Sequence, residues 1–274
     1  FKLKYKNIDL KKNLFSSQTK NYVKKFIDTE KKTNSTIIEI HNRPSYINIL
    51  YQKFKNKILT LYFHNDPLSM DGSKTINDRK NLLKICYRII FNSSWSKKRF
   101  LEGLENKFVN SDKLLIFHQS AERGNLSLIN KKKNWITFVG KLNKAKGYDV
   151  FASAIKQILN KYPTWKAKII GDEKRERIFL NHERADVLGF KEHQDVLKIF
   201  QKTSIAVACS RWEEPFGRTS LEAAANGCAV IITDRGGLPE TVTDAKILKK
   251  LNIKELKKSL EELIKNCLLY TSDA

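Results

Sequence analysis

Short apolar runs alternate with segments of helical periodicity along most of this chain, and this alternation limits the possible folds more than any other feature. In the first half, strand-like runs lie at 36–40, 58–63, 89–91 and 114–117, with helical patterns around 78–87 and 95–104. In the second half, strands are predicted at 136–139, 167–170, 186–188, 205–209 and 229–233, and helices at 148–162, 195–203, 218–226 and 253–265. Continuous apolar strands separated by helices are typical of parallel sheets covered on both faces. The sequence therefore predicts an α/β protein with two βαβ domains.

A polar stretch at 119–134, which contains Gly124, is the best candidate for a linker between the domains. We accordingly expect a first domain at 1–130 and a second at 131–266. The last eight residues, 267–274, resemble the translation of an adapter used to prepare sequencing libraries, and we exclude this tail from the fold. The chain begins at Phe1 with a basic run, which indicates that its first domain lacks its beginning.

The charge balance is strongly basic, with 52 Lys and Arg against 29 Asp and Glu and a formal net charge of +23. Lys greatly outnumbers Arg, and Asn and Ile are abundant, which resembles codon bias more than a nucleic-acid-binding surface. No apolar run approaches the roughly 18 residues that span a bilayer. Cys86, Cys209 and Cys228 show no Cys-x-x-Cys spacing, so we expect buried thiols in a cytoplasmic protein without a zinc site.

The segment 210–223 carries the densest group of functional residue types. Glu214 and Glu222 are eight positions apart, with a strand end before them and a glycine between them. Glu214 is expected at the carboxyl edge of the sheet, where open α/β sheets bind ligands, and Glu222 early in the following helix. Unpaired backbone N–H groups of Gly217, Arg218 and Thr219 at that helix start would suit a phosphate. Carboxylates that flank an anion site are suited to accepting hydrogen bonds from sugar hydroxyls. Either Glu taken alone is more often a solvated or capping acid.

The motifs of the second half, taken together, resemble retaining glycosyltransferases of family 4. The Glu-x7-Glu pattern contains Phe216-Gly217 and is followed by Glu-Ala-x-x-x-Gly. In chain order, the other matching segments are Phe138–Gly147, Ile169–Asp172, Val187–Phe190 and Asp234–Glu240. The resemblance runs from about 136 to 242, and five motifs in the expected order are far more specific than any one. It implies the GT-B fold, in which two Rossmann-like domains face a cleft.

The resemblance also implies roles for individual residues. Glu214 would bind hydroxyls of the donor sugar, and Glu222 would hold the ribose hydroxyls of the nucleotide. Lys141 and Lys146 would pair with the diphosphate, and the nucleotide base would meet the backbone near Leu188. Phe216 and the helix start at 217–219 complete the expected donor-binding set. The family usually has Arg where this chain has Lys141, and Lys lacks the bidentate fork of Arg.

Two histidines of the first half are further candidates. His64 follows the strand 58–63 and resembles the family's histidine near donor sugar and acceptor, so we assign it, with Glu214, to catalysis. His41, at another strand end, is a second candidate. A histidine in such a position is more often a structural hydrogen-bonding residue. The first strand and Gly-rich loop of the family are absent, which indicates an incomplete N-terminal domain.

The function implied by the resemblance is hexosyl transfer, with retention, from a UDP- or GDP-type sugar to a hydroxyl acceptor, either a glycan or a lipid-linked glycan. No Asp-x-Asp occurs, so we expect neither a metal nor a cofactor. No Gly-x-Gly-x-x-Gly follows a strand, which excludes a dehydrogenase. The alternative is a non-catalytic protein of the same fold that binds a nucleotide sugar or a polyanion. The excess of Lys in residues 1–60 also permits peripheral contact with an anionic membrane on its cytoplasmic face, although a solvated surface explains it as well.

Overall fold

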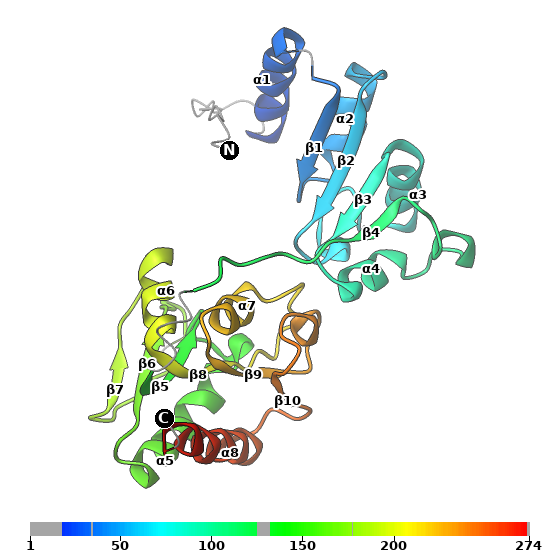
Figure 1. The fold of residues 1–274 in the computed structure, drawn as a ribbon. Helices are drawn as coiled ribbons and strands as arrows, with labels where there is room; N and C mark the ends of the chain where they lie inside the picture. The colour runs from blue at the N-terminus through cyan, green and yellow to red at the C-terminus, as the bar shows by residue number, and fades with distance from the viewer. Residues whose placement is uncertain (1–17, 34, 125–131, 177, 273–274) are drawn as a thin grey trace. The chain divides into compact units, whose positions relative to one another are not determined.

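The computed structural model describes residues 18–33, 35–124, 132–176 and 178–272, which form two compact units (Figure 1). The first unit extends to Phe117 and the second begins at His118. The sequence predicted this division at 130/131. Of the predicted linker, residues 125–131 lie outside the described part, and its last two residues belong to the first strand of the second unit.

The first unit contains one parallel sheet with the strand order β1-β2-β3-β4. Its strands are β1 (Ile37–His41), β2 (Ile58–Phe63), β3 (Arg88–Phe91) and β4 (Leu114–Ile116). Its helices are α1 (Gln18–Thr33), α2 (Tyr46–Lys53), α3 (Ile76–Ile85) and α4 (Ser94–Leu101). Side chains that cap α3 and α4 define where these helices begin. Thr75 and Asp78 form a capping box on α3, and the Ser93 hydroxyl accepts the Ser96 N–H on α4.

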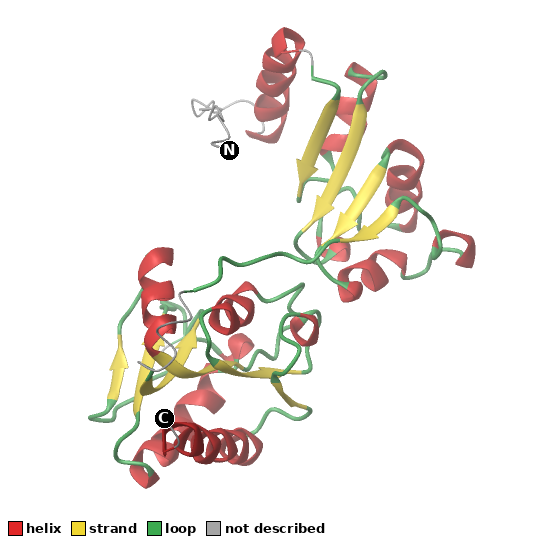
Figure 2. Ribbon diagram, in the orientation of Figure 1, coloured by secondary structure: helices red, strands yellow, loops and turns green. Residues whose placement is uncertain are grey.

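The second unit contains a six-stranded parallel sheet (Figure 2). Its strands are β5 (Lys133–Val139), β6 (Lys166–Ile170), β7 (Ala185–Val187), β8 (Thr203–Ala208), β9 (Ala229–Thr233) and β10 (Lys246–Leu248). Its helices are α5 (Tyr148–Lys161), α6 (His193–Lys202), α7 (Arg218–Ala225) and α8 (Ile253–Ser272). Alternate strand residues point to opposite faces, so one buried cluster joins the sheet to α5 and α8 and a second joins it to α6 and α7.

The strand order of this second sheet, β10-β9-β8-β5-β6-β7, reverses at one point. From β5 the chain adds β6 and then β7 on one side, and it returns to place β8 on the other side of β5. The loops that follow β5 and β8 therefore leave the sheet in different directions. In open α/β sheets such a reversal is where ligands bind, outside the carboxyl ends of the strands.

We expected strands covered on both faces, and the two units differ in how well their strands fit this expectation. In the second unit β9 has one half-buried residue and is otherwise buried, as expected. In β1, exposed and buried residues alternate, because α1 and α2 pack against Ile38 and Ile40 while Ile37, Glu39 and His41 point to the other face. The predictions missed α1, α2 and the short β10.

Cys86, Cys209 and Cys228 are buried, and burial raises the pKa of the thiols of Cys86 and Cys209 to about 12 and of Cys228 to about 11. They therefore act as small hydrophobic residues, as predicted. Among the described helices, none combines the length and the apolar character needed to cross a bilayer.

Candidate functional site

The loops after β5 and β8 are tied together at the switch point of the second sheet. The carbonyl of Ala145 accepts hydrogen bonds from the backbone N–H of Arg211 at 2.8 Å and of Trp212 at 3.1 Å. Gly147 has φ +72°, and a Cβ at this position would lie 1.9 Å from the carbonyl oxygen of Cys209. Only glycine permits both this backbone conformation and this close approach. The approach holds the two loops in a defined geometry.

Lys146 and Glu214, both predicted from the sequence, meet at this point as an ion pair. Lys146 comes from the 3₁₀ turn before α5, and Glu214 from the loop after β8. The Glu214 side chain is only 15% exposed, so its charge is partly removed from water and its pairing with Lys146 offsets that cost. The structure thus places one cation and one carboxylate side by side where a ligand of an α/β sheet is expected.

A third loop, after β9, packs on the backbone of Glu214. The N–H of Gly237 donates to the carbonyl of Glu214 at 2.6 Å, and the N–H of Gly236 donates to the carboxylate of Glu213 at 2.6 Å. Gly236 has φ +60°, and a Cβ there would lie 2.1 Å from the carbonyl oxygen of Glu214. The glycine pair is therefore more than a turn, since it lets one loop pack directly on the backbone of another.

Glu222 lies in α7 and is 8% exposed. Its Oε1 accepts hydrogen bonds from Arg218 Nε at 3.1 Å and Nη2 at 2.7 Å, and from His193 Nε2 at 3.1 Å. Arg218 was predicted to take part through its backbone N–H, and the structure shows that its guanidinium is engaged by Glu222. His193 was not predicted, because it stands at the start of α6 outside every recognised motif.

The start of α7 is the predicted phosphate cradle. Its N-cap residue is Gly217, which has no side chain to cap the helix. The backbone N–H groups of the first turn, including that of Thr219, therefore receive no hydrogen bond from the N-cap residue. Phe216 before it is buried, and its ring stacks on the imidazole of His118 with centroids 5.8 Å apart. His118 Nε2 in turn lies 3.1 Å from Glu240 Oε2. His118 is a second residue that was not predicted from the sequence.

The remaining predicted donor-binding residues lie at the same edge of the sheet. Lys141 follows β5 and is exposed, and within the described part of the chain it makes no recorded ion pair or hydrogen bond through its ammonium group. Leu188 follows β7, and its N–H donates to the carbonyl of Ile169 at 2.8 Å. Lys141, Lys146, Leu188, Glu214 and Glu222 thus all lie in or after loops at the carboxyl ends of strands of one sheet.

The first unit brings the two predicted histidines together. His41 Nδ1 and His64 Nε2 are 2.9 Å apart, and the His41 ring stacks on Tyr62 with centroids 4.4 Å apart. Burial, together with the neighbouring His41, lowers the pKa of His64. His64 is therefore neutral at pH 7, so one of its ring nitrogens can accept a proton. Burial and the nearby Glu39 raise the pKa of the Tyr62 phenol, which stays protonated.

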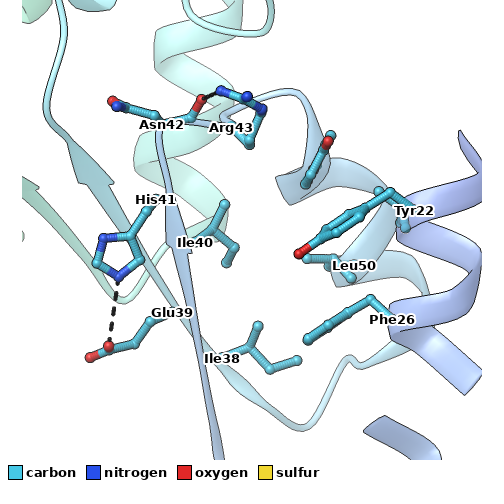
Figure 3. A pocket seen from close by; sticks show the side chains of 11 residues that line it. Tyr22, Phe26, Ile38, Glu39, Ile40, His41, Asn42, Arg43 and Leu50 are labelled. Carbon is cyan, nitrogen blue, oxygen red and sulfur yellow. Dashed lines mark hydrogen bonds and ion pairs between the residues drawn. The ribbon is translucent and has the colours of Figure 1, made fainter. Parts of the chain in front are cut away.

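A pocket of about 780 Å³ lies between α1, β1 and α2 of the first unit (Figure 3). Tyr22 and Phe26 from α1 line one side and Ile38 and Ile40 from β1 the other, while the side chains of Glu39 and His41 lie on the opposite side of β1. None of the predicted donor-binding residues lines this pocket. The site built by the second sheet is instead an open edge formed by loops.

These observations define an α/β protein whose second sheet presents cations, carboxylates and a helix start at its switch point. Residues 122–271 match the family model described as "Glycosyl transferases group 1", and the chain belongs to that family. A relative from Bacillus subtilis, spore coat protein SA, is 24% identical over 244 residues, which cover 79% of this chain and 64% of the relative. The lipopolysaccharide core biosynthesis mannosyltransferase LpsB of Rhizobium meliloti is 31% identical over 121 residues, covering 40% of this chain and 34% of that protein. The D-inositol 3-phosphate glycosyltransferase of Corynebacterium jeikeium is 29% identical over 125 residues, which cover 40% of this chain and 30% of that protein.

Solved structures show the same architecture. HepE from Anabaena, in complex with UDP, superposes with a TM-score of 0.73 at 17% sequence identity, covering 90% of this chain and 73% of that one. The same protein in complex with UDP-glucose gives a TM-score of 0.69 at 18% identity, with the same coverage. The chain therefore has the predicted GT-B glycosyltransferase fold. It spans less than two thirds of the length of spore coat protein SA.

Proposed function

We propose that this chain is a retaining glycosyltransferase that moves a hexosyl unit from a UDP- or GDP-type sugar to a hydroxyl of a glycan or lipid-linked glycan. The observation that carries the proposal is the pairing of Lys146 with Glu214 at the switch point, in the loop that leads to the open start of α7 and to Glu222. The ammonium group of Lys146 and the start of α7 suit the anionic diphosphate, and the carboxylates of Glu214 and Glu222 suit neutral hydroxyls. The name of LpsB, a mannosyltransferase of the lipopolysaccharide core, supports a glycan or lipid-linked acceptor, and the UDP complexes of HepE support a nucleotide-sugar donor.

In the proposed reaction the diphosphate is the leaving group, and negative charge develops on it as the bond from the anomeric carbon breaks. Lys141, Lys146 and the N–H groups at the start of α7 would stabilise that charge. These cationic groups would do the work of a divalent metal, so no metal or cofactor is part of the proposal. The nucleotide sugar is a substrate.

The Lys146–Glu214 ion pair gives donor binding a specific consequence. A diphosphate beside Lys146 would take over the ammonium group, which would release Glu214 to accept hydrogen bonds from the donor sugar. The acceptor hydroxyl would attack the face from which the diphosphate departs. The new bond joins the acceptor oxygen to the anomeric carbon, the bond to the diphosphate breaks, and the hydroxyl proton passes to the departing phosphate. Neutral His64, from the first unit, is proposed to assist at the sugar and acceptor.

We place this activity in the cytoplasm, with the excess of Lys in residues 1–60 available for contact with an anionic membrane face. If such contact is electrostatic, binding to anionic vesicles should weaken steeply as salt rises. Binding that does not change with salt would remove this part of the proposal.

A donor screen tests the function directly. The chain should be stabilised against heat by one class of nucleotide sugar, since a ligand of the folded state raises the melting temperature.

Glu222→Ala should then weaken nucleotide binding by about tenfold or more, because it removes charge-assisted hydrogen bonds. Glu214→Ala should leave nucleotide binding nearly unchanged and lower sugar transfer by about a hundredfold.

The matched control is Glu183→Ala, which removes a carboxylate that is 76% exposed and paired with its neighbour Arg184. It should change neither binding nor transfer. Unaltered kinetics in both Glu222→Ala and Glu214→Ala would refute the site. Tight nucleotide binding without turnover on any acceptor would favour the non-catalytic alternative.

A further inference from the structure

His193 makes a contact that the proposed function does not use. It is the first residue of α6, and its imidazole reaches to α7, where Nε2 lies 3.1 Å from Glu222 Oε1. The N-cap residue of α6 is Glu192, so His193 does not cap its own helix. The two residues are 29 positions apart in the sequence, and the contact joins two helices on the same face of the sheet.

The hydrogen bonds to Glu222 are distributed unevenly over its two oxygens. Arg218 Nε, Arg218 Nη2 and His193 Nε2 all point to Oε1. Within the described part of the chain, no recorded hydrogen bond reaches Oε2. A carboxylate can accept bonds at both oxygens, so Oε2 retains its full capacity for donors supplied by a ligand.

Arg218 and His193 approach Glu222 from different elements. Arg218 precedes it by one turn of the same helix, and the side chains of Arg218 and His193 are similarly exposed, at 54% and 55%. The Arg218 side chain is long and belongs to the same helix as Glu222, so it can change rotamer together with that of Glu222. The imidazole from α6 has fewer rotatable bonds and holds Oε1 from outside the helix. Together they fix which oxygen of the carboxylate faces the ligand.

We propose that His193 is a positioning residue that orients Glu222 to bind the ribose hydroxyls of the donor nucleotide, and so makes the site select ribonucleotides over deoxyribonucleotides. This inference rests on the proposed function. The neutral Nε2–H tautomer suffices for the role, because the imidazole only has to donate to Oε1. Selectivity follows because a carboxylate held in one orientation pairs with a 2′-hydroxyl that the deoxynucleotide lacks.

The test compares UDP with 2′-deoxy-UDP, and GDP with 2′-deoxy-GDP, by calorimetric titration of the 274-residue chain and its variants. The unmodified chain should bind the ribonucleotide about tenfold more tightly, the value of one hydrogen bond to a charged group. His193→Ala should reduce this ratio to about twofold or less, by weakening the ribonucleotide and leaving the deoxynucleotide unchanged. His193→Gln should restore most of the ratio, since its amide N–H can donate to Glu222.

His182→Ala is the matched control. The His182 ring contacts the side chain of Asn160, with Nε2 lying 3.0 Å from Oδ1, and its Nδ1 accepts the backbone N–H of Arg184 at 3.1 Å. Asn160 is near the end of α5 that lies away from the carboxyl edge of the sheet. This variant should keep the full ratio.

A His193→Ala variant that keeps the ribose preference, or that weakens both nucleotides equally, would overturn the role of His193 and leave the proposed function standing. Nucleotide binding without any ribose preference in the unmodified chain would likewise overturn it. Failure of the unmodified chain to bind any of the four nucleotides would overturn the proposed function and this inference with it.

Discussion

The two units share a parallel βαβ pattern, yet their carboxyl edges are organised differently. In the second unit, charged side chains bond to one another, Lys146 with Glu214 between two loops and Arg218 with Glu222 within α7. In the first unit, the edge carries the stacked rings of His41 and His64, whose centroids are 5.2 Å apart, together with an ion pair between Asp66 and Arg99. The second unit presents its paired charges in the loop before, and in the first turn of, a helix that no side chain caps.

The strand order explains this difference. The first sheet runs from β1 to β4 in sequence, so its loops follow one another along one edge. The second sheet reverses between β5 and β8, so the helices that follow these strands, α5 and α7, cover opposite faces, and the carboxyl ends of the two strands form the edge where open α/β sheets bind ligands. Similar local patterns therefore produce different sites when the order of strand pairing differs.

The largest expected effect lies in the core of the first unit. Phe100 of α4 is fully buried, with ring centroids 5.7 Å from Phe63 and 5.3 Å from Phe91. Phe100→Ala should lower the free energy of unfolding by about 3–5 kcal/mol, because it leaves a cavity between rings that cannot collapse. Hydrogen exchange measured by mass spectrometry should show lost protection in α4 and β3 and retained protection in α5 and β8.

Tyr87→Ala provides the control for this substitution, since its side chain is 55% exposed and its removal should cost about 0.5 kcal/mol or less. Equal loss of protection in both units of Phe100→Ala would show that they unfold together, and the comparison between independent units would then fail.

The next effect concerns the loop contact that builds the site of the second unit. Gly147→Ala should cost about 3 kcal/mol, because the new Cβ combines a positive φ with a clash against the Cys209 carbonyl. Gly189→Ala is a matched variant with φ +67° and no atom within 4 Å of the added Cβ, so it should cost only about 1 kcal/mol of backbone strain. Urea unfolding followed by tryptophan fluorescence measures both. Equal costs would show that the close approach does not constrain the loops.

The smallest effect is a pH dependence confined to the first unit. Burial raises the pKa of the Glu30 carboxyl, but hydrogen bonds from Lys57, Ser35 and Thr33 outweigh it and lower the value from 4.5 to about 2. A folded-state pKa below the unfolded one stabilises the protein above about pH 4.5, and this stability is lost as the pH falls toward 2. The contribution is about 3 kcal/mol at most, and Glu30→Gln should remove it. Identical acid-unfolding curves for the two chains would contradict the assignment.

Most strands and helices were predictable because their signals are local. The strand β2 begins where its apolar run begins, and the helix α7 begins directly after Gly217, as the sequence predicted. The prediction missed α1 because its apolar residues, chiefly 22–23 and 26–27, are few within a polar segment that is stabilised by packing on β1. It missed β10 because three residues give no periodicity.

The site was predictable in part. The spacing of Glu214 and Glu222 and the glycines around Lys146 indicated a shared edge, because the end of each parallel strand is visible in its own sequence. The contacts of His193 with Glu222 and of His118 with Phe216 were not predictable, since each joins residues far apart in the chain and neither histidine lies in a motif.

By itself the sequence determined the α/β class, the positions of most elements and the residue types at the carboxyl ends of the strands. These properties depend on neighbours within a few positions, through apolar periodicity, capping and glycine. Only the tertiary structure decided the reversal between β5 and β8, the alternation of buried and exposed residues in β1 and the partners of Glu214 and Glu222. Those properties depend on which distant segments pair, and pairing is settled by packing over the whole unit.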